Sequence, residues 1–193
     1  MKHLEKIVVL FIVSVMLSCS KDDEAKVFPE ENPLNPYLVE AGFDIAYPSL
    51  DGLGFFEIGF TFKPLVSGKI NSVTLKIPDA RDNLLVTIWD VATATIVFED
   101  SFNVATADSE VTYSINPLLL VKDKNYLISM NTDSYYINSS NLFNPTPATY
   151  PITIGTIEIV DSRSRAGTNQ VMPTETSTTS YSGNCSFNFQ QTE

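Results

Sequence analysis

The sequence predicts an all-β protein, built as an antiparallel β-sandwich of jelly-roll type. Apolar and polar residues alternate with a period of two in many short segments, which is typical of half-buried strands. Pro, Gly, Asn and Asp separate these segments, and no stretch has helical periodicity of useful length. Many short strands joined by tight turns favour a sandwich or a jelly roll over other architectures.

The N-terminal segment has the pattern of a secretion signal. A short basic region is followed by residues 7–16, which are apolar except for Ser14. This run is shorter than the ~20 apolar residues that span a membrane, and charged residues after Cys19 prevent its extension. We therefore expect residues 1–18 to be a signal peptide.

The residues around Cys19 indicate a lipid anchor. Met16-Leu17-Ser18-Cys19 resembles the bacterial lipobox, in which the cysteine sulfur is acylated and the cysteine becomes the mature N-terminus. Two or more acyl chains hold a protein stably on a bilayer. The resemblance implies a palmitate-type anchor at Cys19 and outer-membrane lipid as a partner.

The acidic run that follows resembles the tether that sends some Gram-negative lipoproteins to the cell exterior. It consists of Ser20, Lys21, Asp22, Asp23 and Glu24. The alternative is an ordinary solvated tether. We expect an outer-membrane protein that faces the outside of the cell.

The rest of the chain is expected to form a single domain. Residues 19–36 are acidic and carry three prolines, which predicts an extended tether. Residues 37–193 are assigned to one β-sandwich domain. Within them, residues 162–183 are rich in Ser and Thr and poor in large apolar residues, so we expect a long exposed loop there.

The strands are expected in order along this domain. A shift in the alternation around Gly155 predicts a bulge or a strand break. The expected strand segments are 55–63, 73–77, 84–88, 95–102, 111–115, 125–131, 133–138, 149–160 and 185–189.

Charge and composition exclude several classes of function. The formal net charge is −11, and it becomes −12 without residues 1–18, because Lys2 and Lys6 leave with a single acid, Glu5. Such a chain does not suit nucleic acid, whose phosphates require clustered Lys and Arg. The only histidine, His3, leaves with the signal peptide, so no Ser-His-Asp triad or histidine-ligated zinc is expected.

Cys185 is the one thiol left once Cys19 carries lipid, so no disulfide is expected. It alternates with Phe187 and Phe189, which predicts a small buried hydrophobe on the inner face of a strand.

A moderate family resemblance covers about residues 55–136. "EIGFTFKPLVSGKINSVTLKI", "LLVTIWD" and "KNYLISMNTDSYY" together are similar to a family of bacterial extracellular β-sandwich domains without an assigned activity. The matching positions are Phe62, Pro64, Gly68 and Ile88-Trp89-Asp90. The resemblance implies architecture, surface location and a shape like that of carbohydrate-binding modules, and it implies no catalytic residue.

Two polar clusters are candidate calcium sites, because calcium prefers several carboxylate and carbonyl oxygens. One contains Asp79, Asp82 and Asn83, and the other contains Asn131, Asp133 and Asn138. Asp and Asn are also the usual residues of ordinary turns, and this second interpretation is favoured.

A candidate ligand site combines aromatic and polar side chains. Tyr135 and Tyr136 are adjacent, so in a strand they face opposite sides and at least one is a candidate for stacking on a sugar ring. Asp133 and Asn138 would accept and donate hydrogen bonds to hydroxyls. Trp89 is a further candidate, although burial is the favoured interpretation for it.

Three functions follow from these observations. The first is a non-catalytic surface module that binds a glycan or another cell-surface ligand. The second is a structural or assembly subunit that acts through protein contacts. The third, less favoured, is a glycoside hydrolase with a pair of carboxylates.

Overall fold

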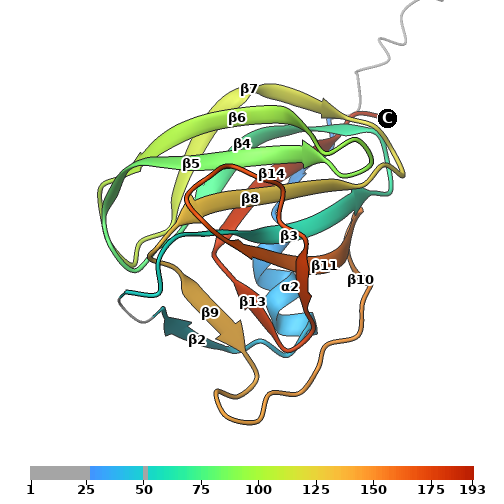
Figure 1. The fold of residues 1–193 in the computed structure, drawn as a ribbon. Coiled ribbons are helices and arrows are strands. Elements are labelled where there is room, and N and C mark those ends of the chain that lie inside the picture. The colour runs from blue at the N-terminus through green and yellow to red at the C-terminus, as the bar shows by residue number, and fades with distance from the viewer. Residues whose placement is uncertain (1–26, 50–51) are drawn as a thin grey trace, which may run out of the picture.

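A computed structural model describes residues 27–49 and 52–193. In these residues one short helix accompanies fourteen strands in three antiparallel sheets (Figure 1). The all-β sandwich predicted from the sequence is confirmed. The signal peptide, Cys19 and the acidic run lie outside the described residues.

The smaller layer of the sandwich is a four-stranded sheet with the order β1-β14-β4-β7. Its strands are β1 (Glu30–Glu31), β4 (Gly68–Leu75), β7 (Val111–Leu120) and β14 (Cys185–Gln191). Strand β7 contains Pro117, which lies where the β4–β7 register is irregular. An edge strand tolerates proline at such a position, since the missing N–H breaks no regular ladder bond.

The larger layer is a seven-stranded sheet with the order β10-β11-β3-β8-β5-β6, and β12 pairs with β11. Its strands are β3 (Phe56–Pro64), β5 (Arg81–Asp90), β6 (Thr95–Val104), β8 (Tyr126–Thr132), β10 (Ile152–Ile154), β11 (Ile157–Ala166) and β12 (Glu175–Ser177). Strand β10 ends at Ile154 and β11 begins at Ile157, so the predicted strand break at Gly155 is confirmed.

A three-stranded sheet closes one end of the sandwich. It has the order β13-β9-β2 and contains β2 (Ile45–Pro48), β9 (Tyr136–Ser139) and β13 (Ser180–Ser182). Figure 1 shows it below the two main layers, next to helix α2 (Leu34–Glu40). No helix in the described part of the chain is long and apolar enough to cross a membrane.

The core lies between the two main sheets and is rich in aromatic rings. Phe187 of β14 packs against Phe62 and Phe60 of β3, with ring centroids 4.4 and 6.1 Å apart. Phe189 and Cys185 are also fully buried, as their alternation predicted. Aromatic pairs in this distance range stabilise a core beyond the area that they bury.

The domain begins earlier than the sequence suggested, so the boundary at residue 36 is wrong for the described part of the expected tether. Strand β1 pairs with β14, and the Glu31 carboxylate accepts the Thr156 N–H at 3.2 Å. Pro33 caps helix α2, and Pro36 lies in its first turn, where no backbone N–H is required. These prolines therefore start a helix that buries Leu34 and Tyr37.

The expectation of one long loop over residues 162–183 is also wrong. Residues 162–166 continue β11 beside β3, and the rest includes β12 and β13. Ser and Thr are compatible with strands when one face is polar, so alternation gives no signal there. Only residues 167–174 and short turns are irregular, and Tyr181 of β13 is fully buried.

Candidate binding pocket

The candidate functional site is a pocket of about 370 Å³ at one end of the seven-stranded sheet. Three connections build it: the segment that follows β2, the turn between β4 and β5, and the turn between β8 and β9. The described residues that line it are Ser49, Gly52, Gly54, Phe55, Asp79, Arg81, Asp133 and Ser134.

An ion pair forms one wall of the pocket. The Arg81 guanidinium donates to Oδ1 of Asp133, and it also lies over the Phe55 ring, 5.3 Å from the centroid. The Arg81 and Asp133 side chains are 24% and 38% exposed, so a ligand can reach both. The pair thus presents positive and negative hydrogen-bonding groups to the same space, beside an aromatic ring.

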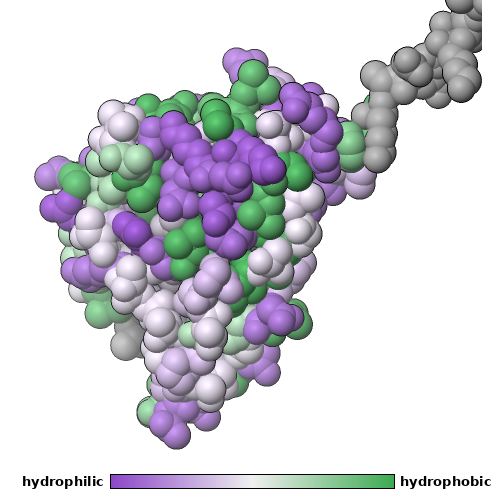
Figure 2. All heavy atoms as spheres, turned by 90° about the vertical axis from the view of Figure 1, so that its right-hand side faces the viewer, coloured by the Kyte–Doolittle hydropathy of each residue, from purple (hydrophilic) through white to green (hydrophobic). Residues whose placement is uncertain are grey.

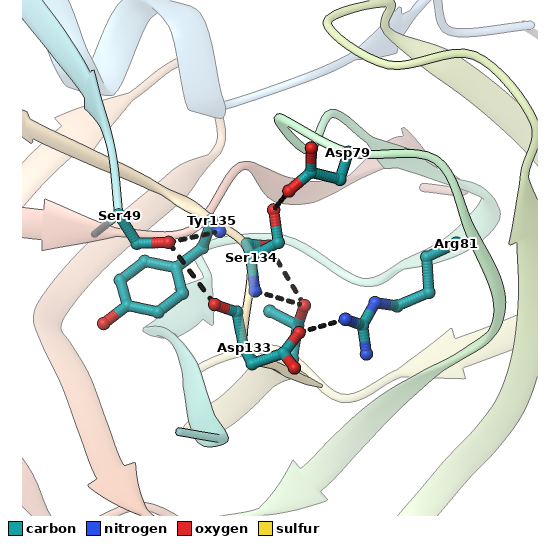
Figure 3. Close-up of polar contacts among 7 residues, drawn as sticks. Ser49, Asp79, Arg81, Asp133, Ser134 and Tyr135 are labelled. Carbon is teal, nitrogen blue, oxygen red and sulfur yellow. Dashed lines mark hydrogen bonds and ion pairs between the residues drawn. The ribbon is translucent and has the colours of Figure 1, made fainter. Parts of the chain in front are cut away.

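The opposite wall is held by hydroxyl groups (Figure 3). Ser134 Oγ donates to Asp79 Oδ2 at 2.7 Å, and the Ser134 N–H donates to Thr132 Oγ1 at 3.1 Å. Ser49 Oγ accepts the Tyr135 N–H at 3.2 Å and donates weakly to the Asp133 carbonyl. These bonds fix the backbone of the β8–β9 turn, so Asp133 and Ser134 are held in place before any ligand arrives.

The residues predicted to bind sugar are only partly brought together. Asp133 lines the pocket, but Asn138 is 2% exposed and its amide donates to the carbonyls of Tyr181 and Gly183 and to Asn184 Oδ1. Asn138 therefore joins β9 to the segment around β13. Its assignment as a ligand residue is wrong.

The predicted tyrosine platform is wrong as well, because both rings are buried. Tyr135 is 4% exposed and packs edge-on against Phe56, with centroids 5.7 Å apart. Tyr136 is 8% exposed, lies under the Lys76 ammonium and donates its hydroxyl to Asp108. Burial, followed by the Asp108 carboxylate, raises the pKa of Tyr136 to about 12.

Trp89 is buried, at 4% exposure, as the favoured interpretation predicted. Its indole N–H donates to Ser129 Oγ at 2.9 Å. No face of this ring is available on the surface, so its assignment as a surface stacking residue is wrong.

The side chains of the two candidate calcium clusters are not brought together. Asp79 lines the pocket, while Asp82 is exposed and the Asn83 N–H donates to the Asn103 side chain. In the second cluster, Asn131 donates to the Gly167 carbonyl, away from Asn138. Among residues 27–49 and 52–193, no three His, Cys, Asp or Glu side chains are grouped so that they could hold a metal ion.

Sequence reasoning missed Arg81 and Phe55, the two residues that most distinguish this pocket. Arg81 lies two residues after Asp79 in the quoted "PDARDN" stretch, and its basic side chain within an acidic turn was the available signal. Phe55 immediately precedes β3, where the alternation treats it as one more strand residue.

Comparisons with known proteins add no family assignment. No protein-family model matches the chain, and no curated protein matches it. The class of protein that the fold and the pocket define is an all-β sandwich with a preformed polar pocket.

Proposed function

We propose that the protein is a non-catalytic surface lipoprotein whose pocket binds a neutral glycan. The pocket carries the argument: its volume suits one or two sugar rings, and it combines two carboxylates, a guanidinium, two hydroxyls and the Phe55 ring. Sugars present hydroxyls around apolar ring faces, which charged hydrogen-bonding groups beside an aromatic ring complement. The lipobox and acidic run supply the surface location.

Binding suits these residues better than hydrolysis. Both pocket carboxylates have partners already, Asp133 with Arg81 and Asp79 with Ser134. Hydrolysis requires one carboxylic acid to donate a proton to the leaving oxygen. Carboxylates held by a guanidinium and a hydroxyl are arranged as acceptors for ligand hydroxyls.

A neutral-glycan array probed with the purified chain tests the proposal, followed by titration with the best ligand. Asp133→Ala and Asp79→Ala should each weaken binding by about tenfold or more, because a hydrogen bond to a charged group contributes ~1.5–3 kcal/mol. Lys63→Ala is the matched control. It removes an ion pair with Glu158 of similar exposure, on β3 and β11, outside the pocket.

Binding that survives both pocket variants would place the ligand elsewhere. An array without any bound glycan would end the proposal. Asp133→Ala should fold, since a partly exposed ion pair contributes only ~0–1 kcal/mol. Asp79→Ala removes one part-buried hydrogen bond, from Ser134, and a thermal melt of each variant checks that it is folded.

An assembly subunit is the second candidate, and one observation favours it. Strand β6 is the last strand in the order of the seven-stranded sheet, and it exposes Ile96 and Val97. An unpaired edge can add a strand from a partner. Glu99 and Asp100 lie on the same strand and disfavour pairing between identical chains. A different protein cross-linked to β6 in intact cells would favour this candidate.

A further inference from the structure

The seven-stranded sheet has an outer face that is turned away from the core. In β3, Ile58, Phe60 and Phe62 point into the core, so Glu57, Gly59 and Thr61 point outward. The strand register places Asn131, Ser129 and Leu127 of β8 beside them, and Leu85, Thr87 and Trp89 of β5 next in line. An outer face of a sheet is usually solvated, yet most of this one is buried.

One segment crosses this face, and we name it the strap: residues 167–174, between β11 and β12. The Gly167 N–H donates to the Phe55 carbonyl, and the Gly167 carbonyl accepts the Asn131 amide at 3.1 Å. Further on, Gln170 Nε2 donates to Thr87 Oγ1 and to Glu99 Oε2, each at 2.6 Å. In Figure 1 the strap is the orange-red loop that passes in front of β8.

Polar contacts hold residues 167–171 of the strap, whereas Pro173 near its end is buried. The strap contains no strand, and Thr168, Asn169 and Val171 are exposed. Segments with few buried apolar contacts are the ones that open at low free-energy cost. Residues 167–171 of the strap should therefore leave this face at the lowest free-energy cost.

The outer face that the strap crosses carries a row of polar side chains, and some of their buried atoms lack hydrogen-bond partners. The Trp89 indole donates to Ser129 Oγ, which in turn donates to Glu57 Oε1 at 2.5 Å. Glu57 and Thr61 are each 1% exposed, and Glu57 Oε2 and Thr61 Oγ1 have no hydrogen-bond partner. Buried polar atoms without partners are rare and costly, and these two belong to the outer face of the sheet that the strap crosses.

This row continues the pocket. Phe55 and Asp133, which line the pocket, immediately flank these two strands: Phe55 lies two residues before Glu57, and Asp133 lies two residues after Asn131. The strap begins at this junction, since Gly167 is bonded to both Phe55 and Asn131. The pocket and the outer face therefore adjoin at the point where the strap begins.

Figure 2 shows that hydrophilic residues gather on the adjoining side of the molecule, with apolar residues scattered between them. This surface suits a polar, hydroxyl-bearing ligand better than an apolar partner.

We propose that the strap is a displaceable cover and that the outer face beneath it, with Glu57, Ser129, Thr87 and Trp89, is a second subsite for a neutral oligosaccharide chain whose end occupies the pocket. Ligand hydroxyls donate to Glu57 and to Thr87 where Gln170 now binds, and the Trp89 indole lies in the same row, two residues beyond Thr87 on β5. This inference rests on the proposed function and specifies a chain rather than a single sugar.

Trp89 reports directly on this subsite, because it is the only tryptophan in the chain. The full chain is titrated with matched neutral oligosaccharides, a disaccharide and a hexasaccharide of the best array ligand, while Trp89 fluorescence and binding heat are recorded. The hexasaccharide should bind more tightly and change Trp89 emission. The disaccharide should bind in the pocket and leave the emission unchanged.

Two strap variants separate displacement from a passive cover. Gln170→Ala removes both bonds of the strap to β5 and β6, so the open form becomes more populated and the hexasaccharide should bind about threefold to tenfold more tightly. Acrylamide should also quench the fluorescence of Trp89 more strongly in Gln170→Ala than in the wild type. Asn169→Ala, at an exposed strap position, is the matched control and should change neither quantity.

The failures of the two proposals are distinguishable. The second subsite is refuted if both saccharides bind with equal affinity and Trp89 emission is unchanged at saturation. It is also refuted if Gln170→Ala leaves the affinity for the hexasaccharide unchanged or lowers it. The strap is then only a structural cover, and the pocket alone binds ligand. If neither saccharide binds, the proposed function fails, and the glycan subsite fails with it.

Discussion

Replacing Phe187 by alanine tests the packing of the two main sheets. Phe187 is fully buried, and its ring centroid lies 4.4 Å from that of Phe62 and 6.1 Å from that of Phe60. The residues around the ring belong to two hydrogen-bonded sheets that can move only slightly. Removing the ring therefore leaves a cavity between the sheets. Such Phe→Ala changes in a core lower the free energy of unfolding by ~3–5 kcal/mol.

For a domain of this size, each kcal/mol lowers the melting temperature by about 2–4 °C. Phe187→Ala should therefore melt roughly 6–20 °C below the wild type in a thermal scan followed by circular dichroism. Phe143→Ala is the matched control, because that ring is 93% exposed, and its effect should stay within ~0.5 kcal/mol. Equal melting temperatures for the wild type and Phe187→Ala would refute the packing of β14 on β3.

Three further predictions concern buried and terminal residues. Burial raises the pKa of Glu57 above its usual 4.5, while Ser129, through its hydrogen bond, and the Asn131 amide act in the opposite direction. The folded state then holds this proton more tightly, so stability is highest below the unfolded-state pKa and falls as pH rises through the folded-state pKa. Glu57→Gln should remove this contribution to the loss of stability at rising pH, measured by urea unfolding at a series of pH values. Identical pH dependences of the unfolding free energy for the wild type and the variant would contradict the prediction. Asn138→Ala leaves two buried carbonyls and the half-buried Asn184 Oδ1 without the amide and should lower the free energy of unfolding by ~1–3 kcal/mol; a change below ~0.5 kcal/mol would show that water replaces the amide. Cys19→Ala should abolish fatty-acid labelling and release the protein from membrane fractions, and a variant that still labels would overturn the lipid anchor.

The sequence predicted the strands well because their signal is local. Alternating Phe56, Ile58, Phe60 and Phe62 specify which face of β3 is buried, and the structure follows that pattern. The sequence misled where polar residues are buried for tertiary reasons. Glu57 and Thr61 occupy outward positions of the same strand, yet both are buried. Alternation along β3 carries no information that the strap, distant in sequence, crosses this face and accepts the Asn131 amide beside Glu57.

The pocket was only half predictable for a related reason. Asp79 and Asp133 could be proposed from composition, but their approach depends on how the β4–β5 and β8–β9 turns meet at one end of the sandwich. Tyr135 and Tyr136 were expected to offer an exposed ring because alternation assigns faces without saying what covers each face. Here Phe56 covers one ring, and Lys76 covers the other.

The central claim is that a neutral glycan binds among the residues of the pocket. Its most direct test is a chemical-shift map of the isotope-labelled protein during titration with the best array ligand. The largest shifts should fall on the backbone amides of Ser49, Asp79, Arg81, Asp133 and Ser134, and they should saturate at one ligand per chain. Shifts confined to β6 and β7, or no shifts at saturating ligand, would contradict the account.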